Sequence, residues 1–339
     1  MSLGENILKL RKLKGLSQEA LAEKLLISRQ TVSLWEKDQT LPTIENLVRL
    51  KDIFNVPIDK IVCEETVGEP KINADSLDTL CAALAYSMGI QPPACAAERN
   101  RELSAYVDRI FDGGKADRVV MYNPDAVAQW IYKKYPEYMR NVKKNTDCEV
   151  YLSTVMPSVT PVCFGTMYTG AQPCVHGIQK YEKPVITIDT LFDALLRAGK
   201  KVALITYATC SLSRIYLDRN LDYYHFDQGS IEAVNAKAME LILRDEHDFI
   251  LIYNGNYDSK MHKNGPESAA SLAELRVNDH IFGVLSNLIA THWKHHNTLV
   301  GFAMDHGCHE IDGGCGSHGL DMPEDINIVH FYKGYRKMQ

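Results

Sequence analysis

The feature that most constrains the fold of this 339-residue chain is an alternation of short apolar runs and amphipathic segments after residue 117. The apolar runs, rich in Val, Ile and Leu, predict strands at 119–122, 150–152, 184–187, 202–205, 249–253, 299–302 and 328–331. The segments between them predict helices at 126–134, 191–198, 231–244 and 268–293. Strands that alternate with helices predict an α/β domain with a mostly parallel sheet and helices on both faces.

Side chains that commonly bind metals follow several of these strands. In open parallel sheets, ligands bind beyond the carboxyl ends of the strands. Each residue taken alone has an ordinary structural role, because an Asp after a strand is often a helix cap. Together they supply three carboxylates and three imidazoles, which suits two divalent ions such as zinc. The set is Asp125, Asp258, His262, Asp305, His306 and His318.

Thr160 places a hydroxyl where a predicted helix begins. It follows the run at 150–152 and a turn that contains Pro157, and the small and apolar residues after it predict a buried helix. The hydroxyl would then lie among the unpaired N–H groups of a helix N-terminus, which favours anions such as phosphate. The alternative is an ordinary N-cap, a position where Thr is common.

Composition indicates an ordinary soluble globular protein, with 45% hydrophobic and 24% charged residues. No apolar run approaches the roughly 20 residues of a membrane helix, and the N-terminus lacks the pattern of a signal peptide, so we expect a cytoplasmic protein that does not bind membranes. The nine cysteines are scattered and odd in number, which favours reduced thiols. Because the net charge is −6, contact with nucleic acid requires a local basic patch.

Residues 6–62 predict a group of short helices, of which two begin at the N-cap signals Ser17 and Ser28. These two helices, joined at residues 26–27, form a helix-turn-helix. Residues 16–22 and 27–36, together with Pro42, closely resemble the DNA-binding domain of the lambda-repressor and Cro family. The resemblance covers about the first sixty-five residues.

This resemblance implies that the second helix of the motif enters the major groove of DNA. The residues implied to contact DNA are Arg29, Gln30, Thr31 and Ser33, with Gln18 from the preceding helix and Arg11, Lys12 and Lys14 at phosphates. The alternative is a helical packing unit with a solvated polar face. Arg and Gln at the start of a recognition helix favour DNA binding, because these side chains read guanine and adenine.

A change in pattern after residue 62 sets the domain boundaries. We predict a helix-turn-helix domain at 1–66, a linker at 67–74, a helical lead-in at 75–117 and the α/β domain at 118–339. The lead-in has two predicted helices, at 77–88 and 98–111, and carries no recognisable chemistry.

From residue 118 to the C-terminus, the motifs resemble the alkaline phosphatase superfamily, particularly its nucleotide pyrophosphatase/phosphodiesterase and phosphonoacetate-hydrolase-like branch. The motifs, including residues 169–177 behind Thr160, occur in that family's order. The resemblance implies that Thr160 is the catalytic nucleophile and forms a phosphothreonine. It also implies two metal sites, one held by Asp258, His262 and His318 and the other by Asp125, Asp305, His306 and the Thr160 oxygen.

Three departures from the family pattern concern the substrate site. Ala126 replaces a glycine that is usual in the family. Cys163 stands where nucleotide pyrophosphatases commonly have an Asn that touches the phosphoryl oxygen, which makes Cys163 the candidate substrate-binding residue and puts nucleotide specificity in question. The short segment 306–318 holds Cys308, His309 and Cys315, for which free thiols are favoured over a structural zinc because the paired C-x-x-C spacing is missing.

The sequence therefore predicts a two-metal phosphodiesterase or phosphonate hydrolase that uses zinc, or else manganese, and acts on a small phosphorylated substrate. Its DNA-binding head indicates a homodimeric transcription regulator. In the alternative, the large domain only senses a phosphorylated ligand and changes DNA binding. Sulfatases and metal-dependent mutases would share the metals, but these branches commonly use Ser or a modified Cys where this chain has Thr160.

Overall fold

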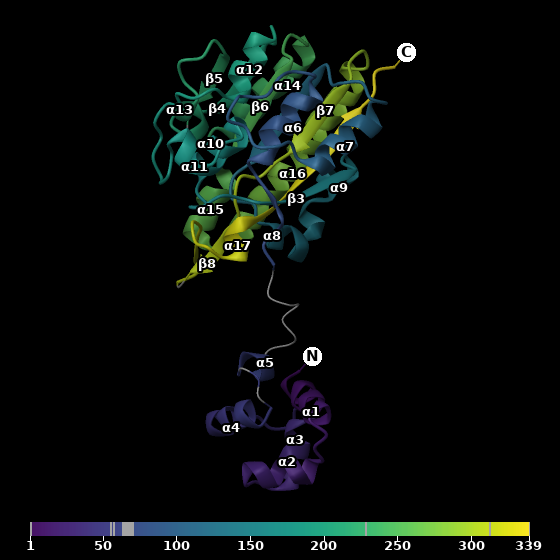
Figure 1. The fold of residues 1–339 in the computed structure, drawn as a ribbon, viewed down its shortest axis with the longest axis vertical. Helices are drawn as coiled ribbons and strands as arrows, with labels where there is room; N and C mark the ends of the chain where they lie inside the picture. Colours follow the sequence, from purple (N-terminus) through teal and green to yellow (C-terminus); the bar gives the residue numbers. More distant parts are fainter. Residues whose placement is uncertain are drawn as a thin grey trace. The chain divides into compact units, whose positions relative to one another are not determined.

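A computed structural model describes residues 2–54, 56, 58–62, 71–227, 229–311 and 313–338. The chain divides into two compact units, Met1–Lys71 and Ile72–Gln339 (Figure 1). This division falls within the predicted linker at 67–74, of which residues 67–70 lie outside the described part of the chain.

The small unit consists of short helices around one apolar core. Its helices are α1 (Leu3–Leu13), α2 (Gln18–Leu25), α3 (Arg29–Trp35), α4 (Ile44–Phe54) and α5 (Asp59–Val62). Three of them begin at a serine whose hydroxyl accepts a backbone N–H, namely Ser2, Ser17 and Ser28. The predicted caps at Ser17 and Ser28 are confirmed, and Val32 and Trp35 anchor α3 in the core.

The large unit is built on an eight-stranded sheet with the order β1-β3-β10-β7-β2-β6-β4-β5. Its strands are β1 (Asp75–Ser76), β2 (Arg118–Pro124), β3 (Cys148–Ser153), β4 (Val202–Tyr207), β5 (Asp222–Phe226), β6 (Phe249–Asn254), β7 (Thr298–Phe302) and β10 (Asn327–Tyr335). β10 is antiparallel to both its neighbours and all other pairs are parallel. β4, β6 and β7 are buried along their whole length, which explains their continuous apolar sequences.

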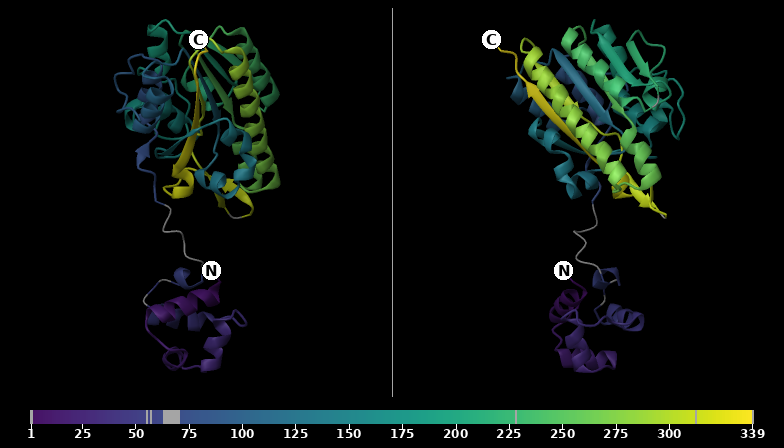
Figure 2. Two further views of the ribbon diagram at one scale, coloured as in Figure 1. Left: turned by 90° about the vertical axis from the view of Figure 1, so that its right-hand side faces the viewer. Right: turned by 180° about the vertical axis from the view of Figure 1, so that it is seen from behind.

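Helices cover both faces of the sheet (Figure 2). On one face lie α14 (Ile231–Arg244) and α16 (Ala269–His292); on the other lie α6 (Thr79–Ser87), α7 (Arg101–Ile110), α10 (Thr160–Thr169) and α12 (Leu191–Arg197). The shorter elements are α8 (Gln129–Lys134), η1 (Pro136–Tyr138), α9 (Arg140–Lys144), α11 (Pro173–His176), α13 (Ser211–Ile215), α15 (Asn256–Asn264), α17 (Pro323–Ile326) and the hairpin of β8 (His309–Ile311) with β9 (Cys315–Ser317). The predicted α/β fold class is confirmed.

Two predicted elements differ from the structure. Residues 184–187 form no strand, because the edge of β4 pairs with β5 and Pro184 has no N–H to donate. The helix predicted from residue 126 begins at Gln129, because residues 125–128 turn away from β2 and Ala126 has a φ of 61°.

No helix of the described residues is long and apolar enough to cross a membrane. The cysteines in this part of the chain are free thiols.

Candidate metal centre and active site

Three parallel neighbours in the sheet bring the predicted carboxylates together. β7, β2 and β6 are adjacent, so their carboxyl ends lie at one edge. Asp125 follows β2 directly, Asp305 lies in the loop after β7, and Asp258 lies in α15, which begins just after β6. The imidazoles come from α15, from the loop after β7 and from the end of β9, and they are His262, His306 and His318.

The first set of ligands, named ligand group 1, consists of Asp258, His262 and His318. Asp258 Oδ1 lies 3.2 Å from His262 Nε2 and 3.3 Å from His318 Nε2, and the two Nε2 atoms are 3.1 Å apart. Asp258 and His262 share one face of α15 because they are four residues apart. The group is partly open to solvent, since the His262 side chain is 42% exposed.

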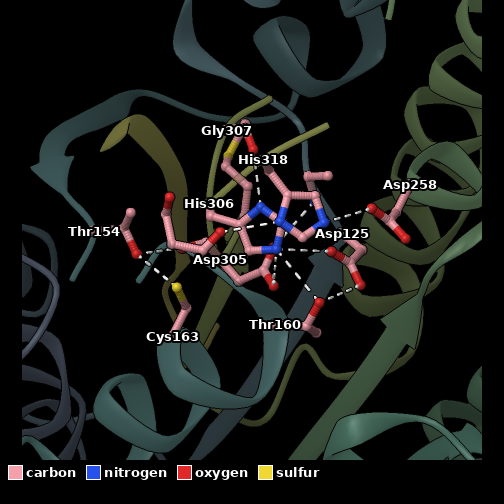
Figure 3. A network of polar contacts seen from close by, with 12 residues as sticks. Asp125, Thr154, Thr160, Cys163, Asp258, Asp305, His306, Gly307 and His318 are labelled. Carbon is pink, nitrogen blue, oxygen red and sulfur yellow. Dashed lines mark hydrogen bonds and ion pairs between the residues drawn. The ribbon is translucent and has the colours of Figure 1, made fainter. Parts of the chain in front are cut away.

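The second set, named ligand group 2, consists of Asp125, Asp305 and His306. His306 Nε2 lies 3.4 Å from Asp125 Oδ1 and 3.4 Å from Asp305 Oδ2. Thr160 Oγ1 lies 3.4 Å from both Asp125 Oδ2 and His306 Nε2 (Figure 3). In contrast to group 1, all three side chains are at most 2% exposed.

The backbone fixes how the three imidazoles face the site. His262 Nδ1 donates to the Gly316 carbonyl at 3.0 Å, His318 Nδ1 to the Ser158 carbonyl at 3.1 Å, and His306 Nδ1 to the Gly307 carbonyl at 2.9 Å. A carbonyl only accepts hydrogen bonds, so each Nδ1 carries a proton and a neutral ring has its lone pair on Nε2. All three Nε2 atoms therefore point at the carboxylates as candidate ligands.

The two carboxylates of ligand group 2 each carry an oxygen atom without a hydrogen-bond donor. Asp125 Oδ1 and Asp305 Oδ2 are buried and accept no hydrogen bond from the described residues. Asp258 Oδ1 is also buried and lies against the Nε2 atoms of His262 and His318. A buried charge without a partner is costly, and buried acids are normally paired or bind metals. In each ligand group, one candidate ligand atom from every member lies within 4.8 Å of the others, which is close enough for a shared metal ion. The residues therefore fit two divalent cations of the kind that His and Asp bind.

The two groups differ in the pKa values of their carboxylic acids. Burial, followed by the nearby carboxylates, raises the pKa of Asp125 well above its ordinary value, and burial raises the pKa of Asp305 to about 7. Burial also opposes ionisation of Asp258, but contacts with His262 and His318 outweigh it and hold the pKa of Asp258 below its ordinary value. The hydrogen bond with Asp258 raises the pKa of His262. Burial therefore favours the neutral acids in group 2, whereas contact with the imidazoles favours the charged carboxylate in group 1.

Thr160 is the first residue of α10 and is not its N-cap. The cap position belongs to Val159, and no side chain caps the helix. The Thr160 hydroxyl is therefore free of the ordinary capping role and lies beside Asp125 and His306. All ten residues of α10 are buried, which places the N–H groups of its first turn at the inner end of the site.

Known proteins resemble both parts of the chain. Residues 119–327 match the model of the type I phosphodiesterase / nucleotide pyrophosphatase family. The chain belongs to this family. Residues 7–61 match a helix-turn-helix family model, so a helix-turn-helix domain is fused to a phosphodiesterase domain, as predicted.

Individual relatives match only portions of this phosphodiesterase-family chain. The HTH-type transcriptional activator BcrR of Enterococcus faecalis is 38% identical over 65 residues, which are 19% of this chain and 32% of that protein. The chain therefore spans about a third of this relative's length. Phosphonoacetate hydrolase from Sinorhizobium meliloti 1021 is 19% identical, with 59% of each chain covered and a TM-score of 0.45. Murine ectonucleotide pyrophosphatase / phosphodiesterase 5 is 20% identical, with 58% of each chain covered and a TM-score of 0.46.

The residues that depart from the family pattern have clear positions. Ala126 adopts a left-handed backbone conformation, with a φ of 61°, in which glycine is free of strain, and its N–H donates to Asp305 Oδ1 at 3.1 Å. Cys163 is fully buried and accepts a hydrogen bond from Thr154 Oγ1 at 3.0 Å. Cys163 does not line the cavity described below, so its predicted contact with substrate stays a prediction without structural support.

The thiols and imidazole of the short segment after His306 lie apart. Cys308 is buried near the Tyr257 hydroxyl, His309 Nδ1 contacts Asp325 Oδ1 at 2.7 Å, and the Cys315 thiol donates to the Lys263 carbonyl at 3.8 Å. In the described part of the chain, these three residues form no group that could hold a metal. This favours the free-thiol interpretation.

A cavity of about 860 Å³ opens beside Thr160, Asp125 and Asp258. Its other described lining residues are Tyr181, Lys183, Tyr207, Thr209, Cys210, Ser211, Gly229, Glu232, Tyr253, Gly255, Asn256, Ser259, Lys260, Lys263 and Glu274. Sequence reasoning did not assign these residues to a cavity, because they come from several helices, strands and loops that only the fold brings together. The one available signal was Tyr253, a phenol at the carboxyl end of a predicted buried strand.

The surface of α3 presents several of the predicted DNA contacts. Arg29 and Gln30 are exposed and Thr31 and Ser33 are half-buried, while Arg29 pairs with Glu19 at 2.9 Å. Gln18 is half-buried and its amide donates to Glu36 at 2.8 Å, which leaves its carbonyl oxygen for other contacts.

The predicted phosphate contact of Arg11 is wrong. Arg11 is 8% exposed, donates two hydrogen bonds to Glu36, and donates a third to the Leu16 carbonyl at 2.8 Å. Its guanidinium therefore joins helices within the head. Lys12 and Lys14 are exposed and remain candidates for phosphate contacts.

Proposed function

We propose that the large domain is a two-cation phosphoester hydrolase with Thr160 as nucleophile, attached to a head that binds specific DNA. The observation that carries this proposal is the gathering of buried carboxylate oxygens and imidazole Nε2 atoms in two groups, with the Thr160 hydroxyl beside the second. A domain that only senses a ligand would not require a nucleophile at that position.

Asp258, His262 and His318 would hold one cation, and Asp125, Asp305 and His306 the other. Zinc suits this mixture of carboxylate and imidazole ligands, with manganese as the alternative. When bound, two divalent cations favour ionisation of a nearby hydroxyl and neutralise the charge that develops during phosphoryl transfer.

Thr160 would attack the phosphorus atom of the substrate. The hydroxyl loses its proton to solvent, and a bond from Oγ1 to phosphorus forms as the bond from phosphorus to the leaving oxygen breaks, which gives a phosphothreonine and a leaving alcohol that takes up a proton from solvent. Water then breaks the Oγ1–phosphorus bond and restores the hydroxyl, and the two displacements together retain the configuration at phosphorus. The uncapped N-terminus of α10 would donate backbone N–H groups to the non-bridging oxygens.

The cavity indicates a hydrophilic leaving group. Its described lining residues include no Val, Leu, Ile, Met or Phe, and hydroxyl, amide, ammonium and carboxylate groups surround the space. A long alkyl chain would leave these polar groups without hydrogen-bond partners. We therefore expect small polar esters or phosphonates to be substrates and lipid esters to be poor ones.

The test is a count of bound metal together with a panel of chromogenic monoesters, diesters and phosphonates, measured before and after chelation. We expect two divalent ions per chain, loss of hydrolysis after chelation, and recovery with zinc or manganese. Fewer than one tightly bound ion, with no hydrolysis after either metal is added, would contradict the proposal.

For the head, we propose a homodimer that binds a two-fold symmetric operator with half-sites about 34 Å apart. Leu41, Ile44 and Val48 are 74%, 81% and 44% exposed, and such apolar side chains on a small domain suit a contact with a second copy. Two linked heads also gain affinity through effective concentration.

Selection from random DNA with the full-length protein tests this proposal. Arg29→Ala or Gln30→Ala should relax preference at one base pair by about 1–3 kcal/mol, whereas Lys14→Ala should weaken all sequences equally and reduce the salt dependence. If no symmetric motif is enriched at moderate salt, the head is a protein-interaction module instead.

A further inference from the structure

Tyr253 occupies a position that the metal ligands and the nucleophile do not explain. Its ring is 5% exposed at the carboxyl end of β6 and makes edge contacts with Phe164 and Tyr207, each with 5.8 Å between ring centroids. Its hydroxyl donates to Asp125 Oδ2. Thr160 Oγ1 lies 3.4 Å from the same oxygen. The tyrosine thus contacts Asp125, the carboxylate of ligand group 2 that also lies beside the Thr160 hydroxyl.

The two carboxylates of ligand group 2 are oriented in the same manner. The Ala126 N–H holds Asp305 Oδ1, and Asp305 Oδ2 has no donor among the described residues. The Tyr253 hydroxyl holds Asp125 Oδ2, and Asp125 Oδ1 is likewise without a donor there. Rotation about the terminal torsion of an Asp side chain is soft, so a hydrogen bond to one oxygen determines where the other points.

Gly255 provides independent evidence for the importance of this hydroxyl. Its φ is −97°, which other residues adopt freely, so its backbone conformation does not require glycine. A Cβ at position 255 would lie 2.6 Å from the Tyr253 hydroxyl oxygen and 3.1 Å from the ring carbon that bears it. The absence of a side chain at position 255 leaves room for the Tyr253 hydroxyl.

We infer that Tyr253 is a positioning residue: by holding Asp125 Oδ2 next to Thr160, it directs Asp125 Oδ1 toward the cation of ligand group 2. This inference rests on the proposed function. It assigns the tyrosine no contact with the cation itself. Loss of the hydroxyl should therefore weaken one cation site and slow the reaction, while the other site is unaffected.

The experiment compares Tyr253→Phe with the parent as full-length proteins. Competition against a chelator should show one of two zinc sites weakened by about 10–100-fold, the usual effect of losing a group that orients a metal ligand. The kcat should fall by a similar factor. Tyr168→Phe is the matched control, because it removes another buried hydroxyl. That hydroxyl donates to Asn123 Oδ1 at 2.7 Å and not to a metal ligand. It should leave both zinc affinities unchanged.

Gly255→Ala provides a second test that keeps the tyrosine hydroxyl. Because the new methyl group would displace that hydroxyl, this variant should weaken the same zinc site. Combining it with Tyr253→Phe should add little, because the displaced atom is then absent. If the losses of zinc affinity in the two single variants instead add up in the double variant, the two substitutions act through separate causes. That result would contradict the inference.

Parent-like affinity at both zinc sites in Tyr253→Phe would also overturn the inference. If the parent protein binds two zinc ions but hydrolyses no substrate, the proposed function is wrong and the inference about Tyr253 is not affected. The comparison of zinc affinities would still decide the role of the tyrosine.

Discussion

Ligand groups 1 and 2 contain similar side chains but are built differently. Group 2 lies at the ends of two central strands, is almost fully buried, and holds carboxylates whose pKa values are raised. Group 1 lies on α15 and at the end of the β8–β9 hairpin, is partly exposed, and contains an Asp whose pKa is lowered. Thr160 contacts only group 2. Under the proposed mechanism, the buried group would serve the nucleophile and the more open group would face the leaving oxygen and solvent.

The largest expected effect sharpens this assignment. Thr160→Ala should lower kcat by roughly 10³-fold or more, because it removes the nucleophile, and it should leave two bound cations per chain. Thr160→Ser, which keeps a hydroxyl, is the matched control and should retain far more activity. Steady-state kinetics and metal analysis provide the measurement. An Ala variant within tenfold of the parent would make water the nucleophile.

Paired substitutions should affect stability in opposite directions in the metal-free protein. Asp305→Asn should stabilise it by about 1–2 kcal/mol at pH 8, because a buried charge with a raised pKa is removed. Asp258→Asn should destabilise it by a similar amount at pH 6, where the charge of Asp258 contacts protonated His262. Urea unfolding provides the measurement. If both variants shift stability in the same direction, the two groups do not differ as described.

A smaller effect is expected from pH alone. Asp125, Asp305 and His262 have raised pKa values, so the folded metal-free protein holds protons at these groups that the unfolded chain has lost. Five histidines with lowered pKa values oppose this near pH 6.5 but are neutral in both states at higher pH, namely His176, His225, His306, His318 and His330. Stability should therefore fall as pH rises from about 7.5 to about 8.5, by at most about 1.4 kcal/mol per pH unit for each proton. Saturating zinc should abolish this fall, because the cation replaces the protons. A flat stability profile without metal would show that these groups titrate normally.

The sequence predicted the parts of the site whose chemistry is local. Asp125, Asp258 and Asp305 could be found because each follows a predicted strand, and parallel strands end at one edge of the sheet. Tyr253 was missed because a phenol that ends a buried strand is ordinary until its partner is known. Arg11 was assigned wrongly because Glu36, 25 residues away in the chain, reaches it only in the folded head.

The same distinction holds for the fold. Continuously apolar strands such as β4 and β6 were predicted because they are buried on both faces. The edge strand β5 was not, because its residues are exposed or half-buried and its sequence, Asp-Tyr-Tyr-His-Phe, lacks an apolar run. Residues 184–187 have an apolar run but pair with no strand of the sheet, where β5 lies next to β4 instead, and a pattern of residues cannot show which segments pair.

The bonds from the three imidazole Nδ1 atoms to main-chain carbonyls have an evolutionary consequence. Because peptide groups of residues 158, 307 and 316 aim the rings, no neighbouring side chain is needed for that purpose. The loop that supplies Tyr181 and Lys183 to the cavity, and the first turn of α14 that supplies Glu232, can therefore change in sequence without misdirecting the imidazole ligands. Such a division separates the residues that shape the cavity from the peptide groups that orient the three rings.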